Sequence, residues 1–211
     1  MNAVFDLDGT LTDPGDGFVR CVVHALSTLG CPHRSEAEIR RHVGPPLQET
    51  LKRLLGAHSE RLDEAVGLYR ERYGREGYLE NQLYPGVREL LEGLRARGVP
   101  LFVATSKPLV FTRAILDHFG LAGFFNGVYG SELDGTRSRK GDLLAHLLQR
   151  ECLASAHTAM IGDRAEDVAG AIANGVRPVG ALWGYGSREE LARAGAKVLC
   201  QAPEDVLAAV M

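Results

Sequence analysis

The sequence has little of what marks metal-thiolate, disulfide-bonded or membrane proteins. Its four cysteines include no Cys-x-x-Cys pair, and no histidine stands at zinc-finger spacing, so a zinc site or a disulfide framework has little support. No apolar run approaches the roughly 20 residues that cross a bilayer, and the first residues carry no basic segment of a secretory leader. We therefore expect no membrane partner and a cytoplasmic location.

An excess of basic residues is also missing. The chain has 24 Lys and Arg against 27 Asp and Glu, so no global positive field attracts a nucleic acid polymer. Small molecules are the expected partners, and the sequence leaves the oligomeric state open. A length of 211 residues suits one core domain with an inserted subdomain.

The apolar pattern changes twice along the chain. A short apolar run at residues 3–7 ends in Asp-Gly-Thr and predicts a buried strand, and the chain then follows helical spacing as far as residue 81. After Tyr84-Pro85-Gly86, short apolar strands alternate with helices, which indicates a parallel sheet covered by helices. Strands are expected at 100–104, 127–129, 158–161, 177–182 and 197–200, and helices at 87–97, 110–119, 143–151 and 165–174.

This pattern predicts an α/β protein whose core is a Rossmann-like doubly wound parallel sheet with an inserted α-helical cap. The core is expected to take residues 1–12 and 83–211, and the cap residues 13–82. An insert after the first strand stands above the carboxyl ends of the strands, where open α/β sheets bind ligands.

Two carboxylates follow the first predicted strand. Side chains alternate along a strand, so Asp6 and Asp8 project to the same side where that strand ends. A cation offsets their repulsion, and an all-oxygen ligand set favours Mg²⁺. Gly9 gives the backbone room to approach an anion, and Thr10 offers a hydroxyl and an amide. Taken alone, the segment also fits an ordinary strand-end turn with local Asp hydrogen bonds.

Three further segments carry polar side chains at expected strand ends or helix starts. Thr105 and Ser106 follow the second core strand, although an ordinary helix N-cap explains them about as well. Lys140 begins a helix, where a cation is unfavourable unless an anion lies nearby; the alternative is a solvated lysine. Asp163 ends a later strand, and Asp167 on the next helical turn also suits a dipole-complementing cap. Because the carboxyl ends of parallel strands converge, we expect one shared site.

In order and separation, the four segments resemble the four motifs of the haloacid dehalogenase superfamily. The helical insert is similar to that superfamily's C1 cap, and the stretch from Ala173 through Gly186 resembles its phosphoglycolate phosphatase and 5′-nucleotidase-like branch. Many relatives follow the motif lysine with proline, whereas here Gly141 follows Lys140. The matching residues are Asp6, Leu7, Asp8, Gly9 and Thr10, then Thr105 and Ser106, then Lys140, then Gly162 through Asp167.

The resemblance implies a Mg²⁺-dependent phosphomonoester hydrolase that acts through an aspartyl-phosphate intermediate. Asp6 is then the nucleophile, and Asp8 protonates the leaving group and later activates water. Mg²⁺ is held by Asp6, by the backbone carbonyl of Asp8 and by Asp163.

The remaining motif residues are implied to bind phosphate or to support those that do. Thr105 and Lys140 bind the transferring oxygens, and Asp167 orients Lys140 or a metal-bound water. The substrate phosphate is further contacted by Gly9, Thr10 and Ser106.

A small phosphorylated metabolite is the expected substrate, with phosphoglycolate and nucleoside 5′-monophosphates both favoured by the resemblance. Gly44 and Pro45 of the cap, and Arg137 and Arg139 before Lys140, are candidate specificity residues. The alternatives for them are a plain interhelix turn and solvated arginines.

Three other functions stay open as alternatives. A phosphomutase of the β-phosphoglucomutase type shares all four motifs, and a binding module of the same fold without turnover belongs to a different class. A dehalogenase is disfavoured by Asp8, because halide leaves without protonation and dehalogenases of the superfamily lack that second carboxylate.

Overall fold

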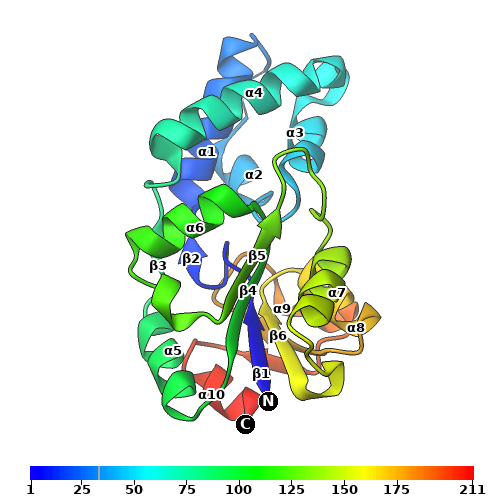
Figure 1. Ribbon diagram of the computed structural model, residues 1–211. Coiled ribbons are helices and arrows are strands. Elements are labelled where there is room, and N and C mark those ends of the chain that lie inside the picture. The colour runs from blue at the N-terminus through cyan, green and yellow to red at the C-terminus, as the bar shows by residue number, and fades with distance from the viewer. Residues whose placement is uncertain (33) are drawn as a thin grey trace. The chain divides into compact units, whose positions relative to one another are not determined.

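In the computed structural model, residues 1–32 and 34–211 are described. They divide into two compact units, an α/β core unit of Met1–Asp13 with Leu83–Met211 and a helical unit of Pro14–Gln82 (Figure 1). Among these described residues, no helix has the length and apolar character that a membrane span requires.

The core unit is built on a parallel sheet. Its strands pair in the order β5-β4-β1-β6-β7-β8, and each of these pairs is parallel, which confirms the predicted α/β class. The order reverses at β1, the first strand of the chain, as in a doubly wound sheet. The strands are β1 (Asn2–Phe5), β4 (Leu101–Pro108), β5 (Gly127–Ser131), β6 (Thr158–Gly162), β7 (Arg177–Ala181) and β8 (Val198–Cys200).

Helices follow the strands and cover the sheet. Helices α5 and α6 lie on one side of the sheet, and α7 and α8 on the other (Figure 1). This is the arrangement that right-handed crossovers between parallel strands produce. The core helices are α5 (Val87–Ala96), α6 (Leu109–His118), α7 (Lys140–Arg150), α8 (Ala165–Ala173), α9 (Arg188–Ala194) and α10 (Asp205–Val210).

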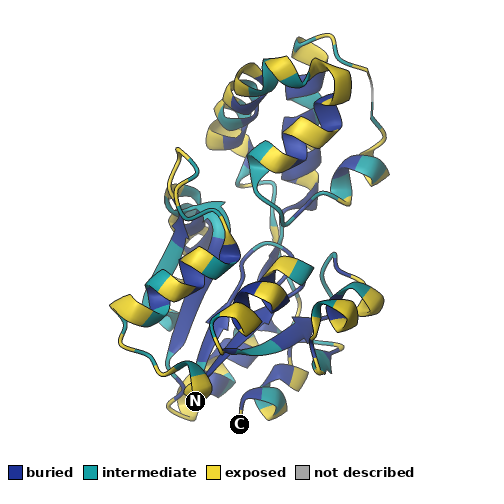
Figure 2. Ribbon diagram, turned by 90° about the vertical axis from the view of Figure 1, so that its right-hand side faces the viewer, coloured by how far each residue is buried: buried dark blue, intermediate teal, exposed yellow. Residues whose placement is uncertain are grey.

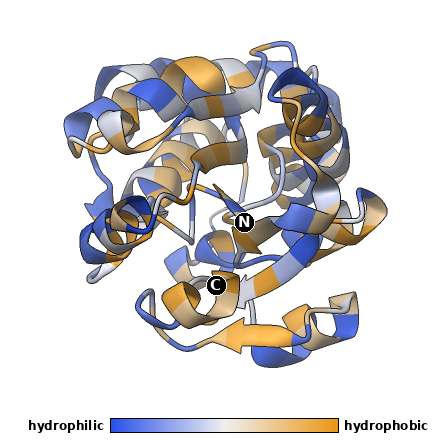
Figure 3. Cartoon of the chain, turned by 60° about the horizontal axis from the view of Figure 1, so that its bottom comes forward, coloured by the Kyte–Doolittle hydropathy of each residue, from blue (hydrophilic) through white to orange (hydrophobic). Residues whose placement is uncertain are grey.

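Hydrophobic burial holds β1 in the centre of the sheet. Ala3, Val4 and Phe5 are fully buried, because β4 and β6 flank the strand and helices cover its faces. On one face, Leu143 and Leu147 of α7 pack in a cluster that includes Val4. Figure 2 shows the strands as buried and the helices as exposed on their outer sides, and Figure 3 shows hydrophobic and hydrophilic residues alternating along the helices.

Two boundaries differ from the sequence prediction at the site. β1 ends at Phe5, whereas the apolar run at residues 3–7 predicted a strand through Leu7, because the backbone turns back on the carbonyl of Leu7. β4 continues through Thr105 and Lys107 to Pro108, whereas the apolar pattern predicted that it ends at Ala104. The pairing with β5 shifts register between Thr105 and Pro108, so an irregularity lets the backbone stay extended past the apolar residues. The polar residues that follow Ala104 therefore belong to the strand itself, and α6 begins at Leu109.

The helical unit has its own small core. Within it, Phe18 meets Tyr69 edge to face, and Tyr69 stacks on Tyr73 at a centroid distance of 5.4 Å. The side chain of Ser35 accepts a hydrogen bond from the Glu38 amide and caps α2. The helices are α1 (Gly15–Thr28), α2 (Glu36–Arg40), α3 (Leu47–Leu55) and α4 (Leu62–Arg72), with a 3-10 turn at Gly56–Arg61 and a π turn at Tyr73–Gly77.

A second, two-stranded sheet marks where the chain leaves and re-enters the core unit. It pairs β2 (Thr12–Asp13) with β3 (Gln82–Leu83). This pairing fixes the path of the chain just after the turn that carries Asp8.

Candidate active site

Polar side chains gather where β1 and its two neighbouring strands end. Asp6 directly follows β1, and Asp163 directly follows β6, which pairs with β1 in parallel. Thr105 lies near the end of β4, the neighbour of β1 on its other side. The sheet order therefore brings together side chains that are far apart in the sequence.

The turn after β1 requires glycine. Gly9 has a φ of +83°, a left-handed conformation that L side chains rarely adopt. A Cβ atom at Gly9 would lie 2.3 Å from Oδ2 of Asp163, so the close approach of the two segments also excludes a side chain. The backbone amides of Thr10 and Leu11 both donate to the carbonyl of Leu7 and hold the turn closed.

Lys140 is the first residue of α7 and is buried beneath the carboxylates. Its Nζ lies 2.9 Å from Oδ1 of Asp6 and 2.7 Å from Oδ1 of Asp167, and it donates to the carbonyl of Ala104 at 3.0 Å. Burial alone would lower the pKa of Lys140, but the two carboxylates outweigh burial and raise it. The lysine therefore carries a positive charge that two carboxylates stabilise, which explains why a cation is tolerated at the N-terminus of α7.

Asp6, Asp163 and Asp167 form a carboxylate cluster. One carboxylate oxygen from each lies within 4.8 Å of the others, and all three residues are buried. Burial, followed by repulsion from Asp167 and Asp6, raises the pKa of Asp163 well above its usual range. Burial also raises the pKa of Asp167, although the charge of Lys140 opposes this shift.

The carboxylate cluster fits a hard divalent cation. Lys140 contacts Asp6 and Asp167. The single positive charge of this lysine does not balance the three carboxylates of the cluster. Asp163 instead accepts from the hydroxyl of Thr10 and from the amide of Tyr185, neither of which brings a positive charge. An oxygen-only donor set around surplus negative charge is the environment that Mg²⁺ favours.

Asp8 has a partner of its own, Lys107, which sequence reasoning missed. Lys107 Nζ lies 2.7 Å from Oδ2 of Asp8, and the lysine side chain is only 8% exposed. Oδ1 of Asp8 is buried and has no hydrogen-bond partner among the described residues. Burial raises the pKa of Asp8, while Lys107 acts in the opposite direction. The two carboxylates after β1 are thus held by two different lysines.

Thr105 and Ser106 are brought to the site but have different environments. Thr105 is buried, and its hydroxyl accepts a hydrogen bond from the amide of Lys107 at 3.3 Å. The carbonyl of Ser106 accepts from the hydroxyl of Ser131 at 2.9 Å, which ties the end of β4 to the end of β5. Their proposed contacts with phosphate oxygens remain predictions.

The loop Trp183–Gly186, which follows β7, forms hydrogen bonds to residues of the site. Sequence reasoning had assigned no site role to this loop. Trp183 donates from Nε1 to the carbonyl of Thr10 at 2.9 Å, and the Tyr185 amide donates to Oδ2 of Asp163 at 2.8 Å. The Tyr185 hydroxyl also bonds to Asp13. A Cβ at Gly184 would lie 2.2 Å from the carbonyl oxygen of Gly9, so glycine is needed for this approach. In the sequence, the alternation of aromatic residues and glycine in Trp183–Gly186 could have indicated that this loop contacts the site.

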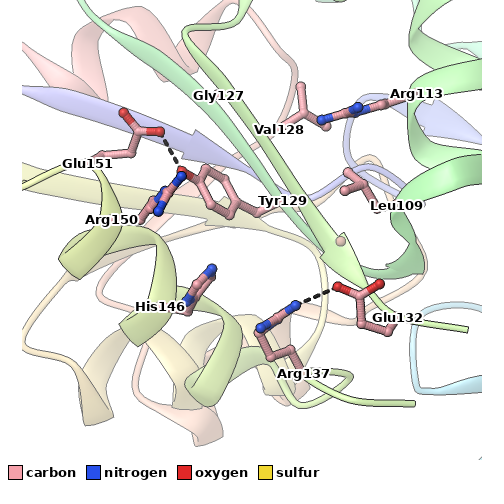
Figure 4. A pocket seen from close by; sticks show the side chains of 11 residues that line it. Leu109, Arg113, Gly127, Val128, Tyr129, Glu132, Arg137, His146, Arg150 and Glu151 are labelled. Atoms are coloured by element: carbon pink, nitrogen blue, oxygen red, sulfur yellow. Dashed lines mark hydrogen bonds and ion pairs between the residues drawn. The ribbon is translucent and has the colours of Figure 1, made fainter. Parts of the chain in front are cut away.

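Arg137 lies beside a different feature, a cavity of about 370 Å³ along the edge strand β5. It pairs with Glu132 there and lines the cavity with Tyr129 and His146 (Figure 4). Arg139 is exposed and precedes α7 without capping it. Gly44 and Pro45 belong to the helical unit, between α2 and α3. A role of these four residues in specificity stays a prediction.

Comparisons with known proteins agree with this arrangement. A family model described as haloacid dehalogenase-like hydrolase matches residues 3–181. A 5′-nucleotidase of Pseudomonas aeruginosa is 48% identical over 190 residues, which cover 90% of this chain and 86% of that protein. Tyrosine-protein kinase PtkA of Mycobacterium tuberculosis is 41% identical over 201 residues, which cover 94% and 68%. A crystal structure of a predicted phosphatase from Clostridium acetobutylicum has a TM-score of 0.95 and 36% identity, covering 99% of this chain and 97% of that chain.

Proposed function

The chain belongs to the haloacid dehalogenase-like hydrolase family, and from this premise we propose that it is a Mg²⁺-dependent phosphatase acting through an aspartyl-phosphate on Asp6. The observation that carries the proposal is the asymmetric bonding of Asp6. The Leu7 amide and Lys140 both bind Oδ1, at 2.7 and 2.9 Å, and no donor of the described residues binds Oδ2. The carboxylate is thus held in place with one oxygen available to react.

Asp6 is the nucleophile in this mechanism. Its carboxylate attacks phosphorus and forms an acyl-phosphate, and the bond from phosphorus to the leaving oxygen breaks. Lys140 contacts Asp6 and offsets the negative charge that gathers around the phosphoryl group. Splitting the reaction in this way replaces one difficult displacement with two easier ones.

Asp8 carries the proton in both halves of the reaction. It gives a proton to the departing alkoxide in the first half, and it takes a proton from the attacking water in the second. A carboxyl whose pKa is raised by burial suits this exchange. The nucleophile and the acid are therefore neighbours along the chain with separate partners.

When bound, Mg²⁺ supplies positive charge that screens the phosphoryl oxygens, so that a carboxylate can approach an anion. Asp6, Asp163 and the backbone carbonyl of Asp8 are the proposed ligands, and the surplus negative charge of the carboxylate cluster supports this assignment. Asp167 contacts Lys140 and positions it.

A small phosphomonoester is the proposed substrate, and a nucleoside 5′-monophosphate is favoured over phosphoglycolate. The support is the 5′-nucleotidase that is 48% identical to this chain. Specificity would then depend on the helical unit, including Gly44 and Pro45, and on the arginines before α7. This substrate choice rests on similarity.

Transfer of phosphate to tyrosine is a second candidate, because a tyrosine-protein kinase is 41% identical to this chain. The two functions differ in the acceptor of the phosphoryl group, which is water in a phosphatase and a phenol in a kinase. A phosphomutase differs in the same way, since its acceptor is a second sugar hydroxyl.

A phosphate-release screen separates these functions. The purified chain is incubated with Mg²⁺ and a nucleoside 5′-monophosphate, phosphoglycolate or glucose 1-phosphate, and with ATP plus a tyrosine peptide. We expect inorganic phosphate from one of the first two, and its loss after complete chelation of divalent ions. Phosphotyrosine formation or glucose 6-phosphate without phosphate release would contradict a phosphatase, and turnover that survives chelation would contradict the metal.

A further inference from the structure

Lys107 is a lysine at the site to which the four motifs give no role, although its side chain is only 8% exposed. It lies at the extended end of β4, and its Nζ is 2.7 Å from Oδ2 of Asp8. The side chains of Lys107 and Asp8 are 8% and 16% exposed, so little solvent screens the pair. The neighbouring lysine, Lys140, makes its ion pairs with Asp6 and Asp167. The two lysines therefore act on different carboxylates.

The backbone around Lys107 is held on several sides. Its amide donates to the hydroxyl of Thr105 at 3.3 Å. Gly130 of β5 packs so close that a Cβ there would lie 2.6 Å from the carbonyl oxygen of Lys107. These contacts fix the point from which the side chain reaches Asp8.

The chemistry of the ion pair decides which oxygen of Asp8 can carry a proton. An ammonium group has three donors and no acceptor, so Oδ2 must accept in the contact with Lys107. A proton on Asp8 is therefore carried by Oδ1, which is buried and has no hydrogen-bond partner among the described residues. A buried polar atom without a partner is costly, and a leaving-group oxygen would supply that partner.

We propose that Lys107 is a positioning residue that holds Asp8 by Oδ2 and so reserves Oδ1 for proton transfer to the leaving group. This inference rests on the proposed phosphatase function. In the first half of the reaction, the bond from phosphorus to the leaving oxygen breaks, its electron pair stays on that oxygen, and the proton of Oδ1 moves there. In the second half, Oδ1 takes a proton from water as the aspartyl-phosphate is hydrolysed.

Leaving groups that differ in their need for a proton test this role. A nucleoside 5′-monophosphate releases an alkoxide that must be protonated, whereas 4-nitrophenyl phosphate releases a phenolate that leaves without help. The specificity constant kcat/KM reports the steps up to departure of the leaving group. A loss of proton transfer should therefore lower kcat/KM for the alkyl ester much more than for the aryl ester.

The variants are Lys107→Met and Lys107→Arg, with Lys197→Met as the matched control because Lys197 is exposed. For Lys107→Met we expect kcat/KM to fall about 100-fold with the alkyl ester and less than about 10-fold with the aryl ester, since general acid catalysis contributes about 10²-fold or more. Lys107→Arg restores the donor and should recover most of the alkyl activity. The control should match the wild type with both substrates.

Two further measurements separate positioning from substrate binding and from folding. The inhibition constant of a non-hydrolysable alkyl phosphonate should stay within about threefold of wild type, because Lys107 is assigned to Asp8 and not to the phosphate. In an Asp8→Asn background, Lys107→Met should have no additional effect that depends on the leaving group. If Lys107→Met does not fold, the Lys107→Arg variant and the same comparison with Lys107→Gln decide the question.

Several results would overturn the assignment of Lys107. Equal losses with the two esters, an unchanged alkyl activity, or a loss that appears in the phosphonate inhibition constant would each contradict positioning of Asp8. An inactive wild type with both esters would contradict the proposed function as well. Wild-type turnover combined with equal losses in the variant would contradict only the inference about Lys107.

Discussion

The ion pairs at the candidate site of the core unit contrast with the surface ion pairs of the helical unit. In the core, the side chains of Asp6, Lys140 and Asp167 are 2–5% exposed and pair with one another. In the helical unit, Arg75 and Glu71 pair on the surface at 66% and 58% exposure. Exposed pairs of this kind contribute little to stability, whereas buried charges are expensive to place and to disturb.

This contrast agrees with the assignment of the proposed chemistry to the core unit. Asp163 and its neighbours gather negative charge in the interior, which opposes folding unless a cation or a lysine offsets it. The helical unit instead buries aromatic rings such as Phe18 and Tyr69. These buried charges of the core are the ones to which the proposed phosphatase reaction gives a role.

The largest effect is expected from replacing the nucleophile. Asp6→Asn keeps the volume of the side chain and an acceptor for the Leu7 amide, so the fold should stay intact. We expect kcat to fall by at least about 10⁴-fold, because the proposed mechanism assigns the acyl-phosphate to Asp6 alone. Phosphate release and circular dichroism check this, with the exposed Asp63→Asn of the helical unit as the control. A folded Asp6→Asn enzyme with full activity would refute the mechanism.

Replacing Lys140, which pairs with two buried carboxylates, should lower the stability of the protein. Lys140→Met leaves Asp6 and Asp167 buried without their shared partner, which should cost about 3 kcal/mol of unfolding free energy. The surface counterpart Arg75→Met should cost less than about 0.5 kcal/mol. Urea unfolding at neutral pH measures both values. If the two variants lost similar amounts of unfolding free energy, the buried ion pairs of the core would not differ in energy from the surface pair of the helical unit.

Two glycine substitutions compare the same chemical change in the two units. Gly184→Ala places a Cβ 2.2 Å from the carbonyl oxygen of Gly9 and 2.4 Å from Cβ of Asp163, so we expect a loss of about 1–3 kcal/mol and lower activity. Gly67→Ala lies within helix α4 with nothing within 4 Å of the new Cβ, and should stabilise by about 0.5–1 kcal/mol. Thermal unfolding of both variants tests these opposite signs. A neutral Gly184→Ala variant would show that the loop after β7 does not fasten the site.

The smallest effect concerns the pH dependence of the helical unit. The hydrogen bond from Arg72 lowers the pKa of Glu80 below its usual value of 4.5. The pair therefore adds stability at neutral pH. This contribution is lost as the pH falls below about 4.5 and approaches the lower pKa that Glu80 has in the folded protein. Glu80→Gln should cost about 1 kcal/mol or less at pH 7, with a smaller difference at pH 4. A larger difference at the acidic pH would contradict the sign of the shift.

The sequence predicted the fold well because the core elements have strong local patterns. Val4 and Phe5 lie in a continuous apolar run, and such runs are typical of strands buried on both faces. The end of β4 was predicted too early, because Thr105 and Lys107 are polar and only pairing with β5 shows that the strand continues. Local polarity does not determine where a strand ends when a neighbouring strand is available.

The candidate site residues were predicted from their places at strand ends and helix starts, because singly most of them also fit an ordinary cap or turn. Asp6 and Asp163 stand directly after strands, so the topology of a parallel sheet predicts that they lie near each other. The partner of Asp8 could not be predicted, because the contact depends on the direction of the Lys107 side chain at an irregular strand end. The bonds of Trp183 and Tyr185 likewise depend on the path of a loop, which local patterns do not determine.

The most direct test of the central claim is to trap the intermediate on Asp6. The enzyme is mixed with its phosphomonoester substrate and Mg²⁺, quenched in acid, reduced with borohydride and digested, and the peptide that contains the first strand is examined by mass spectrometry. Borohydride converts an aspartyl-phosphate to homoserine, so the account predicts this change at Asp6 and its absence without substrate. An unmodified Asp6 under conditions of rapid turnover, or homoserine at Asp8 or Asp163 instead, would contradict it.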